Sequence, residues 1–115
     1  MSSRQGGLKV ISFDEFKRLE LRIGEIKEVE KVPNTDKLLR LTIDVGGETR
    51  QIVAGMAEYF EPAALIGRQV PLLMNLEPKK FRGIESHGMI LAVDVEGRPV
   101  LLQPEKKVPP GSIIR

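Results

Sequence analysis

The sequence predicts a single all-β domain, a small barrel of five short strands with one short helix between the third and fourth. Three observations support this prediction. Apolar and polar residues alternate over residues 39–45, as in a half-buried strand. Turn-forming glycines and prolines separate the apolar runs at short intervals. The alternation changes phase at Gly24, which indicates a first strand bent enough to serve two sides of a barrel.

The chain is expected to open with a leader and a short helix. Residues 1–10 contain small, polar and glycine residues, so we expect them to be flexible, with one domain over residues 11–115. Ser12 can cap a helix, and Glu15 stands three residues later as in a capping box. This pattern predicts a helix that ends near Leu19.

The first strand is expected to bend at a glycine. Leu19, Leu21 and Ile23 alternate with polar residues, but Ile26 falls out of phase beyond Gly24. A glycine at such a phase change is typical of a β-bulge, and we expect the bulge there.

The middle of the chain is expected to form a hairpin, a short helix and two further strands. Gly46 and Gly47 accept the positive φ angles of a two-residue hairpin turn. Pro62 suits the first position of a helix, and Gly67 suits its C-terminal cap. The expected elements after the first strand are a loop at 32–37, strands at 39–45 and 48–54, a helix at 60–67, strands at 70–74 and 89–95, and a return segment at 99–102.

This order of elements matches the five-stranded Greek-key barrel called the OB-fold, which often binds oligonucleotides. The spacing of short strands alone equally allows an SH3-like barrel or a small sandwich.

Composition excludes several classes of site. The chain has no cysteine and one histidine, so disulfides and thiolate chemistry are excluded, and neither a zinc site nor a cofactor is expected. Asp14 and Glu15 are interpreted as a helix-start pair rather than a metal site. No apolar run approaches the length of a membrane span, and the first residues lack the apolar middle of a signal peptide. We therefore expect a soluble, cytoplasmic protein.

Residues 75–89 are the strongest candidate for a functional segment. They lie between two apolar runs, which predicts a long loop between two buried strands. Lys79, Lys80 and Arg82 place three cations within four positions, and Phe81 lies among them. Cations suit phosphates and a ring suits a base, so the segment favours an anionic, planar partner. A solvated basic hairpin explains the same composition equally well.

Five segments, in register over nearly the whole chain beyond Val10, form a recognisable set: residues 14–17 with 21–24, 33–38, 50–55, 75–83 and 86–89. Together they resemble a known family, the tRNA-binding domain found at the C-terminus of many methionyl-tRNA synthetases, in stand-alone tRNA-binding proteins and in cytokine precursors. The resemblance implies an OB-fold that binds tRNA largely by shape, a homodimer in the stand-alone and bacterial-appendage forms, and no catalysis.

The same resemblance implies the residues of the site. The sequence departs from the family at Glu77, where lysine is frequent, and at His87, where a glutamate or another polar residue is frequent. Phe81 joins the candidates either as a platform on which a base stacks or as a hydrophobic anchor for the loop. The candidate contact or site-shaping residues are Asn34, Lys37, Arg50, Gln51, Asn75, Lys79, Lys80, Phe81, Arg82, Ser86 and Met89.

Simpler roles compete for some of these positions. Asn34 and Lys37 either cap the turn before the second strand or reach the ligand. Arg50 and Gln51 are neighbours on a strand and face opposite sides, so we expect at most one of them on the binding face. Met89 is expected to pack in the core beneath the loop.

Three classes of function follow. The favoured one is a non-catalytic tRNA-binding module that assists an aminoacyl-tRNA synthetase, most simply the methionyl enzyme, in cis or in trans; Met1 favours a separate polypeptide. The alternative is a peptide-binding export chaperone of the same fold, whose relatives tend to lose the segments that match residues 34–38 and 50–53. A hydrolase or nuclease would need clustered acids or a usable histidine, and the neighbours Ser86 and His87 diverge in extended chain.

The tail carries apolar residues with few obvious positions inside so small a barrel. They either close its end or build a two-fold interface, and the resemblance favours the interface. These residues are Leu101, Leu102, Ile113 and Ile114.

Overall fold

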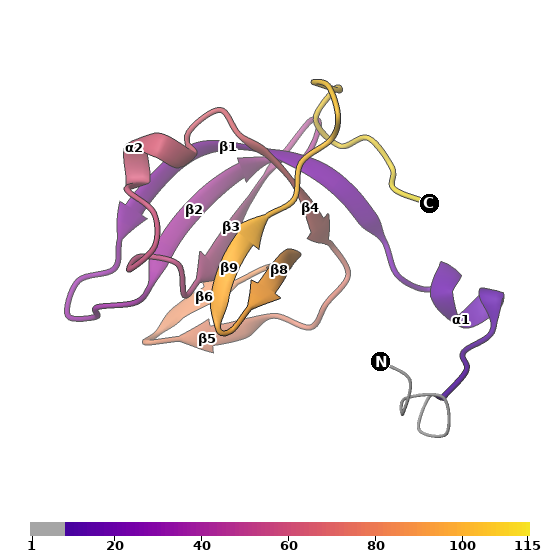
Figure 1. Ribbon diagram of the computed structural model, residues 1–115, viewed down its shortest axis with the longest axis horizontal. Helices are drawn as coiled ribbons and strands as arrows, with labels where there is room; N and C mark the ends of the chain where they lie inside the picture. The colour runs from indigo at the N-terminus through magenta and orange to yellow at the C-terminus, as the bar shows by residue number, and fades with distance from the viewer. Residues whose placement is uncertain (1–8) are drawn as a thin grey trace.

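The computed structural model describes residues 9–115, and its strands form a nearly closed antiparallel barrel (Figure 1). The all-β prediction of an OB-like barrel is confirmed. The main sheet has five strands in the order β3-β2-β1-β4-β7, and two separate hairpins, β5-β6 and β8-β9, are added to it. The elements are α1 (Phe13–Lys17), β1 (Leu21–Lys31), β2 (Leu39–Asp44), β3 (Thr49–Ala54), α2 (Pro62–Leu65), β4 (Gln69–Leu73), β5 (Lys79–Phe81), β6 (Ile84–Ser86), β7 (Met89–Ile90), β8 (Ala92–Val95) and β9 (Arg98–Leu101).

The long strand β1 serves two sides of the barrel, as predicted. Its first half pairs with β4 and its second half pairs with β2. The bulge lies between Ile26 and Glu28 rather than at Gly24. Gly24 instead permits close packing, because a Cβ there would lie 2.5 Å from Cγ2 of Ile43 and 2.7 Å from Cδ1 of Leu72.

The core lies inside the barrel and follows the predicted alternation of β2. Leu39, Leu41 and Ile43 are fully buried, and the residues between them are half-buried. The helix α2 contributes the fully buried Leu65 and begins with Pro62, so its start is confirmed, although it is shorter than predicted. Within residues 9–115, these side chains belong to one apolar cluster.

The segment after β4 is folded against the free edge of β3. The backbone N–H of His87 donates to the carbonyl of Gln51 at 2.8 Å, and the N–H of Val53 donates to Oγ of Ser86 at 3.0 Å. These bonds close the barrel on that side. The predicted long loop is therefore corrected to a hairpin, β5-β6, with short connections at either end.

The predicted fifth strand, residues 89–95, is divided. β7 pairs with β4, whereas β8 turns away and pairs with β9. Val93 belongs to the apolar run that was predicted to be a buried strand, but it is exposed in the single chain, as is Val95. Met89 was expected in the core and is 43% exposed, because Ile90 takes the inward position of this two-residue strand.

The helix α1 stands apart from the barrel (Figure 1). Its capping box is confirmed: Oγ of Ser12 accepts from the N–H of Glu15, whose carboxylate accepts from the N–H of Ser12. The helix ends at Lys17, before the predicted Leu19. Of the predicted leader, residues 1–8 lie outside the described residues. In residues 9–115, no helix is long and apolar enough to cross a membrane.

Candidate nucleic-acid interface

The hairpin of residues 79–86, called the basic hairpin below, presents three exposed cations, Lys79, Lys80 and Arg82. Strand alternation puts Lys79 and Phe81 on one face and Lys80 on the other. The ammonium of Lys79 lies 5.2 Å from the centre of the Phe81 ring, a cation–π contact that leaves its charge facing outward. Within residues 9–115, Lys79, Lys80 and Arg82 form no ion pair. Their charges are therefore available to an anionic partner.

The tip of the hairpin is brought against the loop between β1 and β2. Arg82 and Gly83 have φ angles of 54° and 83°, which make the two-residue turn. Arg82 and Lys37 line one shallow hollow of about 370 Å³, together with Thr35, Asp36 and Leu38. Two predicted cations from distant parts of the chain thus meet at one surface, which suits a phosphate group.

Asn34 lies in the same loop and is exposed. Its φ angle is 64°, a left-handed conformation that asparagine tolerates better than most residues. The loop is held by the hydroxyl of Thr35, which donates to the carbonyl of Val32 at 2.9 Å. The structure therefore gives Asn34 a role in the turn and leaves its side chain open to a partner.

Arg50 clasps both ends of the segment that carries the basic hairpin. Its Nη1 donates to the carbonyl of Met74 at 3.0 Å and to the carbonyl of His87 at 3.2 Å, and its Nε pairs with Glu48 at 3.1 Å. Met74 precedes the hairpin and His87 follows it. The guanidinium thus lies on the core-facing side of β3 and holds the two ends of the hairpin segment in place.

Gln51 and Ser86 fasten the base of the basic hairpin to β3. Nε2 of Gln51 donates to the carbonyl of Glu85 at 2.8 Å. Ser86 is 4% exposed, and its hydroxyl accepts from the N–H of Val53 and donates to the carbonyl of Gly88 at 3.2 Å. The imidazole of His87 lies 3.1 Å from the carboxylate of Glu85 instead of contacting Ser86. Both functions of the serine hydroxyl are therefore used in holding the hairpin.

Asn75 and Met89 lie outside these two groups. Oδ1 of Asn75 accepts from the N–H of Glu20 at 2.8 Å, and its Nδ2 donates to the carbonyl of Arg18 at 2.6 Å. The amide therefore ties the junction of α1 and β1 to the end of β4. Met89 is exposed on β7.

The resolved pKa shifts lie away from the basic hairpin. The hydrogen bond from Lys27, at 2.8 Å, is the largest influence on Glu25 and holds the pKa of that carboxyl below its ordinary value. The same bond raises the pKa of Lys27. Within residues 9–115, no group of three His, Cys, Asp or Glu side chains is arranged to hold a metal ion.

A match to a known family identifies the kind of domain that the chain forms. The family described as "Putative tRNA binding domain" matches residues 21–113, which is most of the chain. The chain belongs to this family. The match begins at β1 and ends in the tail, so this tRNA-binding domain includes the barrel, the basic hairpin and β8-β9.

Similar proteins place the domain among methionine–tRNA ligases and related small proteins. The methionine–tRNA ligase of Methanothrix thermoacetophila is 55% identical over 106 residues, which cover 92% of this chain and 16% of the ligase. The chain thus spans about one sixth of that relative's length. A MetRS related protein from Pyrococcus horikoshii has a similar structure, with a TM-score of 0.88 and 36% identity over 94% of this chain and all of that one.

A second solved structure carries a different name. The chaperone CsaA from Bacillus anthracis has a TM-score of 0.83 and 34% identity, over 93% of this chain and all of that one. The barrel with its added hairpins is thus shared by proteins named for two activities, and the fold alone does not separate them.

Sequence reasoning missed the residues that hold the site. Glu85, whose carbonyl accepts from Gln51, and Met74, whose carbonyl accepts from Arg50, were not among the candidates. These partners form through long-range contacts, for which a single sequence gives no signal. The exposed cations, by contrast, were found from their local clustering.

Proposed function

We propose that this domain is a non-catalytic tRNA-binding module that assists an aminoacyl-tRNA synthetase, most simply the methionyl enzyme, in cis or in trans, in the cytoplasm. One observation carries the proposal: three cations without ion pairs in residues 9–115 stand on a hairpin that buried hydrogen bonds fix to the barrel. Family membership and the similarity to methionine–tRNA ligases support the choice of tRNA.

Binding would rest on the phosphate backbone and on RNA shape. Lys79, Lys80 and Arg82 contact phosphates, with Lys37 beside Arg82 in the shared hollow. Phe81 is half-buried, so part of its ring anchors the hairpin while the exposed part remains open to a base. Because Arg50, Gln51 and Ser86 fix the hairpin before binding, little ordering entropy is lost on association.

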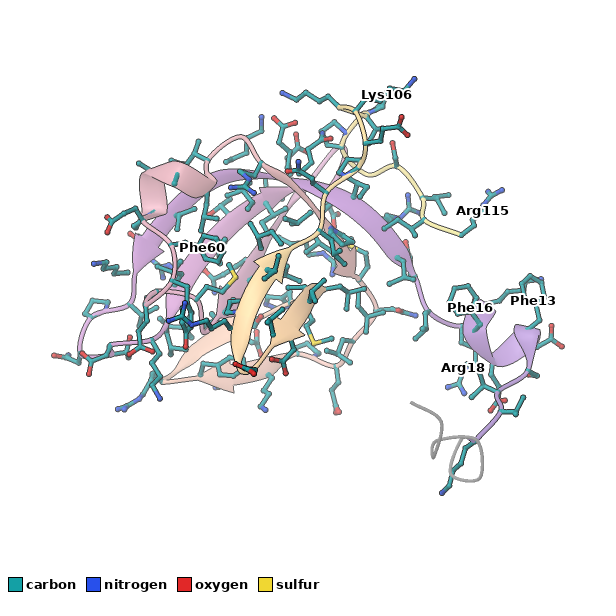
Figure 2. The ribbon with its side chains drawn as sticks, viewed as in Figure 1. Phe13, Phe16, Arg18, Phe60, Lys106 and Arg115 are labelled. Carbon is teal, nitrogen blue, oxygen red and sulfur yellow. The ribbon has the colours of Figure 1, made fainter. Side chains whose placement is uncertain are left out.

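The domain is proposed to act as a homodimer. Phe13 is 73% exposed and Ile113 is 54% exposed, and they line one apolar groove of about 430 Å³ with Phe16, Leu19 and Ile114. Figure 2 shows Phe13 and Phe16 on α1, with Arg115 at the end of the chain on the same side of the molecule. A second copy would bury these side chains by two-fold symmetry. Of the predicted tail residues, Leu101 packs against the core and Leu102 is exposed.

A peptide-binding chaperone is the alternative function, and the similarity to CsaA supports it. Two observations favour tRNA. Identity reaches 55% with a methionine–tRNA ligase and 34% with that chaperone. The segments at 34–38 and 50–53 are intact and lie at the tip and the base of the basic hairpin.

The test compares tRNA, an unstructured RNA and duplex DNA at two salt concentrations. The variant Lys79→Ala/Lys80→Ala/Arg82→Ala should lose the preference for tRNA and lower the slope of log affinity against log salt by about 2 to 3, from about 0.7 to 0.9 per phosphate contact. The matched control, Lys79→Arg/Lys80→Arg/Arg82→Lys, keeps the charge and should keep the slope. Equal, weak binding of all three nucleic acids by every variant would instead direct the test to unfolded peptides.

A further inference from the structure

A second positively charged surface lies on the opposite side of the barrel from the basic hairpin. The turn between α2 and β4 with the first residue of β4 (residues 66–69) and the tail after β9 (residues 103–107) line an open, shallow cleft of about 430 Å³, called the tail cleft below. Lys106 stands at one edge of the molecule in Figure 2, and β5-β6 lies at the opposite edge in Figure 1.

The tail cleft has a surplus of positive charge. Arg68, Lys106 and Lys107 line it, with Glu105 as the acid among the lining residues. Within residues 9–115, Arg68 and Lys106 form no ion pair. Lys107 lies 3.7 Å from Glu25, whose other carboxylate oxygen is already bonded to Lys27 at 2.8 Å. Glu25 therefore already has Lys27 as a cationic partner, and Lys107 adds a second positive charge beside it.

The cations of the tail rest on a fixed base. Gln69 is 6% exposed, and its side chain makes two hydrogen bonds to the backbone of Val108: Nε2 donates to the carbonyl at 2.7 Å, and Oε1 accepts from the N–H at 3.0 Å. Nε2 also lies 3.1 Å from Oε1 of Glu25. This clasp holds the tail immediately after Lys107, so the lysines are positioned before a partner arrives.

We infer that the tail cleft is a second phosphate-backbone contact for the RNA that the basic hairpin binds, which rests on the tRNA-binding function proposed above. The two basic surfaces lie on opposite sides of a domain whose principal extents are 44, 32 and 29 Å. An RNA that curves round the domain would contact both surfaces at once, whereas a short single strand would contact one. This difference would favour tRNA over unstructured RNA without any base being read.

The lining of the tail cleft favours RNA over an acidic protein. Protein interfaces depend on apolar or aromatic anchors at their centre, and only Ile66 and Pro104 offer apolar surface among side chains that are otherwise polar or charged. Phosphate contacts need exposed cations and no such anchor.

The experiment titrates the full chain with tRNA and with a single-stranded RNA of about six nucleotides, within the range that one OB-fold binds. For Arg68→Ala/Lys106→Ala/Lys107→Ala, the tRNA salt slope should fall by about 2 to 3, with weaker affinity at low salt, while binding of the short strand is unchanged. The matched control, Arg68→Lys/Lys106→Arg/Lys107→Arg, should bind tRNA as the wild type does. Within residues 9–115, the side chain of Lys106 makes no hydrogen bond or ion pair, so Lys106→Ala alone should lower the slope by about 0.7 to 0.9.

Distinct results separate this inference from the proposed function. If the basic-hairpin variant loses tRNA and the tail-cleft variants bind as the wild type does, the second contact is refuted and the proposed function stands. If the wild type does not prefer tRNA at all, the proposed function fails first. If the tail-cleft triple variant keeps its tRNA slope and loses binding to polyglutamate, the cleft serves an acidic protein and the inference is overturned.

Discussion

Ser86→Ala separates the stability of the basic hairpin from its charge. The substitution removes the hydroxyl that accepts from the N–H of Val53 at 3.0 Å, and Val53 is itself buried. A buried donor left without a partner costs about 1–3 kcal/mol. For a domain of this size, each kcal/mol lowers the midpoint of thermal unfolding by roughly 4 °C, so a decrease of about 4–12 °C is expected.

The assay for Ser86→Ala combines thermal unfolding with tRNA titration at two salt concentrations, well below the midpoint. The salt slope should not change, because no cation is lost. Ser112→Ala is a matched control, since its hydroxyl donates to Pro109 in an exposed turn, and its effect should stay within about 0.5 kcal/mol. Wild-type stability for Ser86→Ala would refute the role of this hydrogen bond, and a reduced salt slope would show that the hairpin's cations depend on it for their placement.

Three further predictions concern packing in the core, stability at low pH and the proposed dimer interface. Gly24→Ala should cost about 1–3 kcal/mol in urea unfolding, because the added Cβ would meet Ile43 and Leu72; an unchanged midpoint would mean that these side chains move aside freely. The pKa of Glu25 is lowered in the folded state, so the ionised carboxylate stabilises the fold above the ordinary pKa of 4.5, and this stabilisation is lost as pH falls through the folded pKa. Glu25→Gln should therefore lose less stability than the wild type between pH 7 and pH 3. Phe13→Ser should halve the mass measured by light scattering, while Tyr59→Ser, at another exposed aromatic residue, should not; a wild type that is already monomeric would refute the proposed interface.

Local signals in the sequence predicted most of the barrel. The alternation of β2 and the capping box at Ser12 depend on neighbours within a few residues, and both are confirmed. Gly46 and Gly47 both have φ near 85°, with Val45 and Glu48 paired across them, as the two-residue turn requires.

Features that depend on distant partners were not predicted. The apolar run through Leu91 gives no sign that the chain leaves β4 there and pairs with β9. The exposure of Val93 and Val95 could not be predicted from the sequence either, since an apolar strand residue can face either a core or another subunit. A single sequence also cannot show that Gln69 clasps Val108, because their hydrogen bonds join separate parts of the chain.

The candidate site divides into residues that carry charge and residues that place it. Arg50 illustrates the difference: the family resemblance makes it either a contact or a site-shaping residue, and its guanidinium bonds the carbonyls at both ends of the hairpin segment. Replacing Arg50 would therefore weaken RNA binding by displacing Lys79, Lys80 and Arg82, although Arg50 does not contact these residues. Substituting the arginine of the Arg-Gln-Ile-Val segment would weaken binding under either role, so affinity alone does not distinguish contact from placement. The salt slope measured together with thermal stability does distinguish them. A lost phosphate contact lowers the slope while the hairpin stays in place, whereas lost placement lowers stability as well.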